Sequence, residues 1–368
     1  MKILLAIDNL LGGGKERQFV ELVKGLSQRS DFTLQVVVFY SEFHYKNIFN
    51  LGVRVTVIDK KEWFGIKGFI KLFQLLNRFK PDLVHSWHPL ISLFLLPFKP
   101  FFGFRFIEGS VRSAAPKNKH KWFDYHATRI SSFLAQATVA NSKAGLAAFK
   151  IKNAPRFIYN GFDLGRIEGL SKVPAISANA EIAGTIRIGM VGNFTDNKDY
   201  DTFFSAAECL MESYHYLNFY SIGDGPGIGM FRAKYKDSQS IHLLGKIIEV
   251  EKFISEFDIC VLCSTEYGEG ISNSILEYMS LRKPVIALDC PGNREVIEEE
   301  VSGLFYTLRD SVSLSRQIER LIVNPELREK LGAAGFGTLI TRFSFETMIT
   351  AYASLYNEVT TINDNKIV

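Results

Sequence analysis

Short apolar runs rich in β-branched residues alternate with segments of helical periodicity along both halves of this 368-residue chain, and no other feature constrains the fold as much. Such alternation predicts βαβ units, in which parallel strands form a sheet and helices cover its two faces. We therefore expect an α/β protein with two Rossmann-like, doubly wound parallel sheets. The expected strands are 2–8, 34–40, 53–59, 83–87, 106–111 and 138–141 in the first half, and 186–193, 218–223, 258–263, 284–289 and 303–307 in the second.

A segment without clear periodicity separates the two halves. Residues 169–185 are rich in Ser, Ala and Gly, so we interpret them as a linker between domains at 1–168 and 186–345. The remaining segment, 346–368, is expected to be a helix followed by a tail. Sheets of this type bind ligands outside the carboxyl ends of their strands, so two such domains facing each other would surround one cleft with loops.

The net charge of +4 hides an asymmetry between the two halves. Residues 1–170 contain 25 Lys and Arg against 12 Asp and Glu, which leaves 18 against 27 for the rest of the chain. The hydrophobic (47%) and charged (22%) fractions are those of folded soluble proteins, so a disordered or collagen-like chain is excluded. The basic charges are spread over many expected elements rather than gathered in one helix or tail, which argues against a nucleic-acid partner.

The four cysteines indicate a reduced protein without a structural metal. Their number in a chain of this length does not suggest a disulfide framework, and no His or Cys cluster has zinc-ligand spacing. Cys260 and Cys263 form a C-x-x-C pair, but the surrounding run DICVLCS predicts a central strand. These features fit the reducing cytosol.

Two apolar segments raise the question of membrane contact. The N-terminal run is interrupted by Asp8 and lacks the usual small-residue cleavage site, so we interpret it as a buried strand rather than a signal peptide. The run 90–98 is too short to span a bilayer, but it continues as KPFFGFRF, with aromatic residues between Lys99 and Arg105. That pattern suits either a membrane surface or a packed helix followed by a strand.

A glycine-rich loop follows the first expected strand. Gly12, Gly13 and Gly14 precede Lys15 and Glu16 at the start of a helix, where backbone amides suit a phosphate. The pattern is neither a dinucleotide fingerprint nor a P-loop, and a tight strand-to-helix turn explains it equally well.

The segment 265–295 carries the strongest chemical pattern. Glu269 is expected in a loop and Glu277 in a helix that begins near Asn273, so two carboxylates flank the amides of residues 270–273. Carboxylates accept hydrogen bonds from hydroxyls, and amides at a helix start favour an anion. Hydroxyls of a sugar or ribose beside a phosphate match this set, although a solvated acidic helix cap explains either Glu taken singly.

Eight stretches follow one another along the chain in a fixed order: GGKER (13–17), HSWHP (85–89), NSKAG (141–145), YNGFD (159–163), VGNFTDNKDYDTFFSAA (191–207), IGDGP (222–226), LLGK (243–246) and EGISNSILEYM with KPVIA and PGNREV (269–296). These ordered motifs resemble retaining glycosyltransferases of the GT-B fold, family 4, which include bacterial polysaccharide and lipopolysaccharide transferases. The resemblance covers nearly the whole chain and implies that 346–368 packs back on the first domain.

The resemblance implies roles for individual residues in the second domain. Lys198 would pair with the donor diphosphate, Glu269 would hold hydroxyls of the transferred sugar, and Glu277 would hold the ribose. Asn193 stands where the family usually has an arginine, so it would only hydrogen-bond. Further residues implied to line the donor are Gly13, Gly14, Gly223, Gly270, Ile271, Ser272 and Asn273.

The sequence departs from the family where a histidine usually faces the reacting sugar. The matching stretch, EGSVRSA, offers Ser110 or Arg112, and Arg112 could stabilise the leaving phosphate or bind an acidic acceptor. Glu16, His88 and His120 are acceptor-side candidates. The family needs no catalytic base, because the leaving phosphate is thought to take the proton of the acceptor hydroxyl.

The resemblance also implies that no metal or other cofactor is required. The D-x-D formed by Asp199 and Asp201 could be interpreted as a metal motif, but its place at a helix start favours a helix cap.

The function expected from these features is transfer of a sugar from a nucleotide sugar, preferentially a UDP-sugar, to a lipid-linked oligosaccharide or surface polysaccharide. The expected place is the cytoplasm, with docking on the anionic inner face of the membrane as an extension. Three alternatives remain open: a catalytically silent sugar-nucleotide-binding protein, a nucleic-acid binder that uses the basic half, and a GT-B nucleotide-sugar epimerase.

Overall fold

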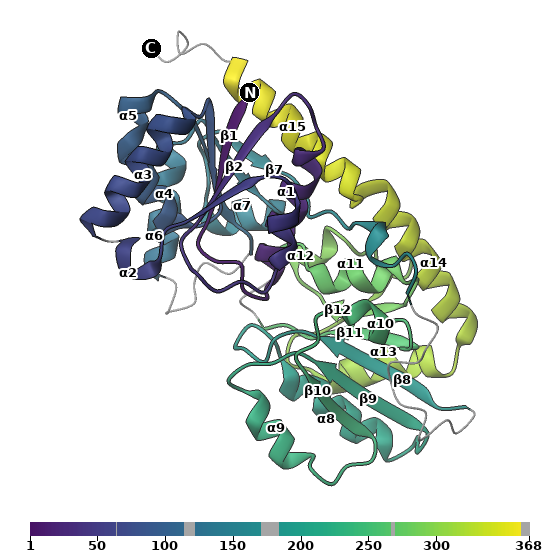
Figure 1. Ribbon diagram of the computed structural model, residues 1–368. Helices are drawn as coiled ribbons and strands as arrows, with labels where there is room; N and C mark the ends of the chain where they lie inside the picture. The colour runs from purple at the N-terminus through teal and green to yellow at the C-terminus, as the bar shows by residue number, and fades with distance from the viewer. Residues whose placement is uncertain (64, 114–121, 171–183, 266–268, 362–368) are drawn as a thin grey trace. The chain divides into compact units, whose positions relative to one another are not determined.

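A computed structural model describes residues 1–63, 65–113, 122–170, 184–265 and 269–361 (Figure 1). The chain forms two compact units: unit 1 comprises Met1–Gly161 and Phe345–Val368, and unit 2 comprises Phe162–Ser344. Residues 162–168, which we expected in the first domain, therefore group with unit 2. Most of the expected linker, 171–183, lies outside the described residues.

Unit 1 is built on a seven-stranded parallel sheet with the order β3-β2-β1-β4-β5-β6-β7. Its strands are β1 (Lys2–Ile7), β2 (Thr33–Val38), β3 (Arg54–Val57), β4 (Leu83–Ser86), β5 (Arg105–Val111), β6 (Ala137–Ala140) and β7 (Pro155–Phe157). Its helices are α1 (Gly14–Ser27), α2 (Lys60–Trp63), α3 (Ile66–Phe79), α4 (Pro89–Leu95), α5 (Lys99–Phe102), α6 (Trp122–Leu134), α7 (Lys143–Phe149) and α15 (Phe345–Thr361).

Helices cover both faces of this sheet because successive strand residues point to opposite sides. On β1, Ile3 and Leu5 join a core with α1 and α15, whereas Leu4 and Ala6 join a second core with α3 and α4. Figure 1 shows α3, α4 and α5 on one side of the sheet and α1 and α15 on the other.

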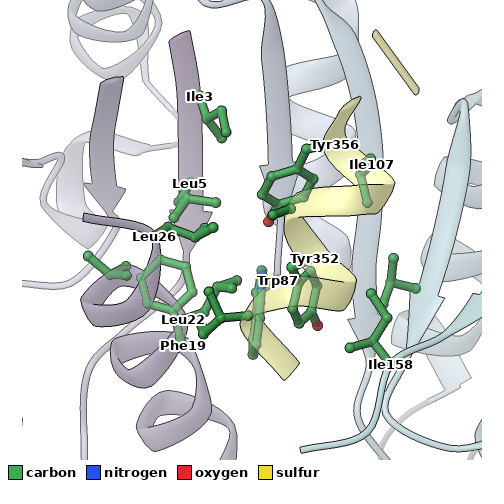
Figure 2. Packing of buried hydrophobic residues seen from close by; sticks show 14 of the residues in the cluster. Ile3, Leu5, Phe19, Leu22, Leu26, Trp87, Ile107, Ile158, Tyr352 and Tyr356 are labelled. Atoms are coloured by element: carbon green, nitrogen blue, oxygen red, sulfur yellow. The ribbon is translucent and has the colours of Figure 1, made fainter. Parts of the chain in front are cut away.

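Helix α15 lies inside the first of these cores. Its Tyr352 and Tyr356 are buried beside Trp87, as Figure 2 shows. It also lies close to α1 at Gly25, where an added Cβ would be 2.9 Å from a ring carbon of Phe345 and nearer still to Ile349. The C-terminal helix is therefore an integral part of unit 1.

Unit 2 contains a six-stranded parallel sheet with the order β10-β9-β8-β11-β12-β13. Its strands are β8 (Ile186–Val191), β9 (Leu217–Ile222), β10 (Ile241–Gly245), β11 (Ile259–Leu262), β12 (Val285–Leu288) and β13 (Leu304–Tyr306). Its helices are α8 (Tyr200–Met211), α9 (Ile228–Lys234), α10 (Val250–Ile254), α11 (Asn273–Ser280), α12 (Pro291–Arg294), α13 (Ser311–Ile322) and α14 (Pro325–Arg342).

Both sheets reverse their strand order at one point, and this positions the candidate sites. The reversal falls between β1 and β4 in unit 1 and between β8 and β11 in unit 2. Loops that leave neighbouring strands in opposite directions open a crevice there, which is the usual ligand site of doubly wound sheets.

The predicted fold class is confirmed, with two omissions. The short exposed β7 and the strand β10 were not predicted. The packed-helix interpretation of 90–98 is also confirmed, because Ile91, Leu95 and Phe98 are buried before β5 begins. Across the described ranges, no helix combines the length and apolar character needed to cross a bilayer.

Candidate active site

Two loops meet at the strand-order reversal of unit 2. Lys198, in the loop after β8, forms an isolated antiparallel bridge with Ser264, which follows β11. The backbone N–H of Thr265 donates to the carbonyl of Asn197 at 3.1 Å. Residues more than 60 positions apart are thereby held in one rigid edge of the crevice.

Lys198 and Glu269 form an ion pair at this edge. The Lys198 Nζ atom lies 2.5 Å from Glu269 Oε1, and both side chains are mostly buried. The Ser264 hydroxyl donates to the same carboxylate oxygen at 2.9 Å. The pair places a positive charge beside an oriented carboxylate, as simultaneous contact with an anion and neighbouring hydroxyls would require.

Glycines bring the surrounding backbone together. At Gly223, where φ is +152°, an added Cβ would stand 2.7 Å from the carbonyl carbon of Gly192. At Gly292 an added Cβ would stand 2.7 Å from the carbonyl carbon of Glu269 and 2.8 Å from the carbonyl oxygen of Gly270. Gly223 therefore lets the loops after β8 and β9 touch, and Gly292 supports the loop that carries Glu269.

Helix α11 is anchored to the same strands. The Tyr278 hydroxyl accepts from the Val191 N–H at 2.6 Å and donates to the Val261 carbonyl at 3.2 Å. The Ser274 hydroxyl donates to the Val191 carbonyl at 2.9 Å. These bonds fix the start of α11 against the ends of β8 and β11, and burial raises the pKa of Tyr278 well above its ordinary value.

The residues expected to line the donor lead into this helix. Ser272 is the N-cap residue, although its side chain makes no cap hydrogen bond, and Asn273 is the first helical residue. Ile271 and Ser272 are almost fully buried. Residues 270–273 therefore place the α11 N-terminus, with its partial positive charge, directly after Glu269.

Glu277 is buried and paired with a cation, unlike a carboxylate that is freely accessible to a sugar. Its side chain is only 3% exposed and accepts a hydrogen bond from Arg166 at 3.3 Å. Arg166 also pairs with Glu251 and lies over the Phe162 ring, 4.6 Å from its centroid. Arg166 is the cation of this site that sequence reasoning missed, and a ribose at Glu277 would have to share the carboxylate with it.

Asp199 is a helix cap, as predicted. It accepts from the Thr202 N–H at 3.0 Å and from the Thr202 hydroxyl at 2.6 Å at the start of α8. Within the described ranges, no group of three His, Cys, Asp or Glu side chains is arranged to hold a metal ion. Cys260 and Cys263 are buried on and beside β11, which confirms the strand interpretation of the C-x-x-C pair.

Unit 1 has its own cluster of charged side chains at the reversal between β1 and β4. Lys15 Nζ lies 2.5 Å from Asp8 and 3.3 Å from Glu16, and His88 Nε2 lies 3.7 Å from Asp8. Gly13 is the N-cap of α1, and an added Cβ there would lie 3.3 Å from the Glu16 carboxyl carbon. Glu16 therefore folds back over the glycine turn.

The local charges set the protonation of this cluster. Burial opposes ionisation of Asp8, but Lys15 and His88 outweigh it and hold the pKa of that carboxyl below its ordinary value. Burial raises the pKa of Glu16 and lowers the pKa of His88. At neutral pH the His88 side chain is therefore a neutral imidazole. Its Nε2 atom faces Asp8, and its Nδ1 atom accepts from the Leu90 N–H.

Arg112 is held by aromatic side chains in unit 1. Its guanidinium carbon lies 3.5 Å from the Trp87 ring centroid, its Nε donates to the Gly109 carbonyl at 2.7 Å, and its Nη2 donates to the Tyr352 hydroxyl at 3.0 Å. This places a fixed cation near the end of β5, where sequence comparison located the departure from the family. His120 lies outside the described residues.

Residues 185–324 match the protein-family model described as "Glycosyl transferases group 1". The chain is thus similar to the group 1 glycosyltransferases over 140 of its 368 residues, all of them within unit 2. The structural comparison shows the GT-B fold: the crystal structure of Anabaena Alr3699/HepE in complex with UDP-glucose superposes with a TM-score of 0.83 over 97% of this chain and all of that chain, at 18% identity.

Two curated relatives are named for lipopolysaccharide core biosynthesis and for a poly(ribitol-phosphate) transferase. The chain is 23% identical to lipopolysaccharide core biosynthesis glycosyltransferase LpsE of Rhizobium meliloti over 93% of this chain and 95% of that protein. It is also 23% identical to poly(ribitol-phosphate) alpha-N-acetylglucosaminyltransferase of Staphylococcus aureus, over 54% of this chain and 41% of that protein.

The structure of the glycosyltransferase divides the predicted site residues into two groups. Unit 2 joins Lys198 to Glu269 and places Asn193, Gly223, residues 270–273 and Glu277 on the elements around them. Unit 1 gathers Gly13, Gly14, Glu16 and His88 at one strand-order reversal, with Arg112 on the next strand of the sheet.

Proposed function

We propose that this glycosyltransferase moves a hexosyl group from a UDP-sugar to a hydroxyl of a lipid-linked oligosaccharide or surface polysaccharide precursor, with retention of anomeric configuration and without a metal ion. The observation that carries the proposal is the Lys198–Glu269 pair beside the α11 N-terminus. It supplies a cation and amide N–H groups for a diphosphate and, next to them, a carboxylate for sugar hydroxyls.

The chemistry requires stabilisation of a departing diphosphate. As the bond between the sugar C1 and the phosphate oxygen breaks, negative charge grows on that oxygen, and Lys198 together with the helix terminus would stabilise it. The acceptor oxygen bonds to C1 on the same face, and its proton passes to the leaving phosphate. Asn193 contributes only hydrogen bonding in this proposal, and Arg112 is assigned to the phosphate or to an acidic acceptor.

The comparisons support the choice of substrates. Structures of HepE hold UDP and UDP-glucose, and the relatives named above act on lipopolysaccharide core and poly(ribitol-phosphate). HepE supports a UDP-sugar donor, and the two relatives support a cell-envelope glycan acceptor. Work on a lipid-linked acceptor would take place at the cytoplasmic face of the membrane.

The first test is calorimetric titration with UDP, GDP, CDP and ADP. UDP should bind most tightly, and Lys198→Ala should weaken binding about 10- to 150-fold, the range for a charge-assisted hydrogen bond. Lys236→Ala, which removes an exposed lysine of unit 2, serves as the matched control. Equal UDP affinity in wild type and Lys198→Ala would refute the assigned diphosphate contact.

The second test follows turnover with UDP-sugars and extracted lipid-linked acceptors. Glu269→Gln should retain UDP binding and lose sugar transfer, and NMR of the product should show the anomer of the donor. Turnover should persist in EDTA. Conversion of the donor without any acceptor would instead indicate an epimerase, and UDP binding without turnover of any sugar would indicate a silent binding protein.

A further inference from the structure

Unit 1 exposes a row of large apolar side chains that no part of the candidate site uses. Four of them lie on α3 at the spacing i, i+3, i+4 and i+7, which places them on one side of the helix. A fifth belongs to α5. We call this set the apolar ridge: Ile66, Phe69, Ile70, Phe73 and Phe101.

The exposure of the ridge is not a result of loose packing of α3. The opposite side of α3 is fully used, because Leu72, Leu75 and Leu76 are buried in the core beneath it. Ile66 and Phe101 nevertheless remain 80% and 81% exposed. Folded proteins rarely leave a contiguous apolar surface uncovered unless it binds something.

Ring contacts make the ridge continuous across two elements. Phe69 contacts Phe98 with ring centroids 4.5 Å apart, and Phe73 contacts Phe102 at 5.3 Å. Lys99, at the start of α5, donates to the Leu134 carbonyl at 3.0 Å and so connects this surface to the end of α6. Helix α6 adds further exposed apolar side chains: Ile130, Phe133 and Leu134.

Basic residues surround the ridge. Residues 60–80 contain six Lys and Arg and a single acidic residue, Glu62, which pairs with Lys71 at 2.5 Å. Residues 99–105 add Lys99 and Arg105 and no acid. A short helix with an apolar side and flanking lysines is the pattern of a segment that lies in the interface of a bilayer.

The positive charge around the ridge distinguishes between two possible partners, a second copy of the chain and a lipid bilayer. A second copy of the chain would meet this surface through a two-fold axis, so six basic residues would face the same six. A bilayer with anionic headgroups offers complementary charge, together with an apolar layer for the phenyl rings. The observations therefore favour lipid.

We propose that the apolar ridge docks unit 1 on an anionic lipid bilayer, with α3 lying along the interface and the Ile66, Phe69, Ile70, Phe73 and Phe101 side chains entering the acyl boundary. This surface is separate from the residues proposed to bind donor or acceptor, so the docking stands or falls independently of the proposed function.

The test is flotation with vesicles of phosphatidylcholine alone and of phosphatidylcholine with phosphatidylglycerol. Wild type should partition onto the anionic vesicles and much less onto the neutral ones. Ile66→Ser with Phe101→Ser should lower partitioning about 100-fold, since each buried Ile or Phe side chain contributes about tenfold or more. Lys61→Gln with Lys67→Gln should lower it about 20-fold on anionic vesicles at low salt.

The matched control is Val312→Ser with Val323→Ser, which removes two exposed apolar side chains of unit 2, one on α13 and one at its C-cap. It should partition as wild type does. UDP titration of every variant reports on the donor site: unchanged UDP affinity with lost flotation supports the ridge, and flotation without UDP affinity refutes only the proposed function.

Three results would overturn the docking proposal. The ridge variant could float as well as the α13 control, or wild type could fail to prefer anionic vesicles. Sedimentation could also show a wild-type dimer that the ridge variant converts to monomer, which would assign the ridge to a second copy.

Discussion

Gly292→Ala should impair catalysis by moving the loop that carries Glu269. The added methyl would stand 2.7 Å from the Glu269 carbonyl carbon, whereas ordinary contact begins near 3.4 Å. The obstacle is backbone, so the carbonyl carbon must retreat by about 0.7 Å and its oxygen, which lies closer to the added methyl, by about 1.5 Å. A displacement of about 1 Å at a catalytic group costs on the order of 100-fold in rate.

The assay is turnover of the UDP-sugar, with the melting temperature measured in parallel. We expect kcat to fall about 100-fold, with a loss of stability of roughly 1–3 kcal/mol from overpacking. Gly337→Ala is the matched control, because its added methyl meets nothing within 4 Å on α14. Wild-type kcat in Gly292→Ala would refute the argument that this glycine positions Glu269.

Three further perturbations test other parts of the structure. Arg166→Gln should destabilise the protein by about 3–5 kcal/mol in urea titration, since it removes the cation that pairs with the buried Glu251 and Glu277 carboxylates; stability equal to wild type would show that these pairs are not maintained. Gly25→Ala should lower the melting temperature because its methyl would overlap Ile349, and Ile349→Ala in the same chain should restore part of the loss. Burial and the nearby Arg112 hold the pKa of His85 well below 6.5, so the unfolded chain binds the extra proton and stability falls as pH drops below 6.5. Relative to His85→Gln, wild type should lose about 1 kcal/mol of unfolding free energy between pH 7.5 and 5.5; parallel pH profiles would contradict this.

Local pattern predicted most of the fold. Nearly every strand has an apolar, β-branched core that is recognisable in isolation. Strand β7 consists of three exposed residues beginning with Pro155, so it lacks that signal and exists only because β6 lies beside it. In β10, three of five residues are only partly buried, and the apolar run is correspondingly weak.

Contacts between residues far apart in the sequence limit how much of the site could be predicted. The Lys198–Glu269 pair follows from topology, since both residues leave the neighbouring strands β8 and β11. The ion pair of Arg166 with Glu277 joins residues 111 positions apart, and no local sequence pattern predicts it. The same holds for Arg112, whose position depends on Trp87 and on Tyr352 from the far end of the chain.

The return of α15 to unit 1 has a consequence for the order of events during synthesis. Unit 2 is a continuous stretch, whereas the unit 1 core around Tyr352 and Tyr356 stays incomplete until Phe345 and the residues after it have been made. At 5–20 residues per second, the ribosome needs about 10–40 seconds to pass from Gly161 to Phe345. A chain stopped at Ser344 should therefore hold a protease-resistant unit 2 next to a digestible unit 1, and resistance of both would contradict this. Until α15 has been synthesised, unit 1 of the nascent chain stays partly assembled and accessible to chaperones.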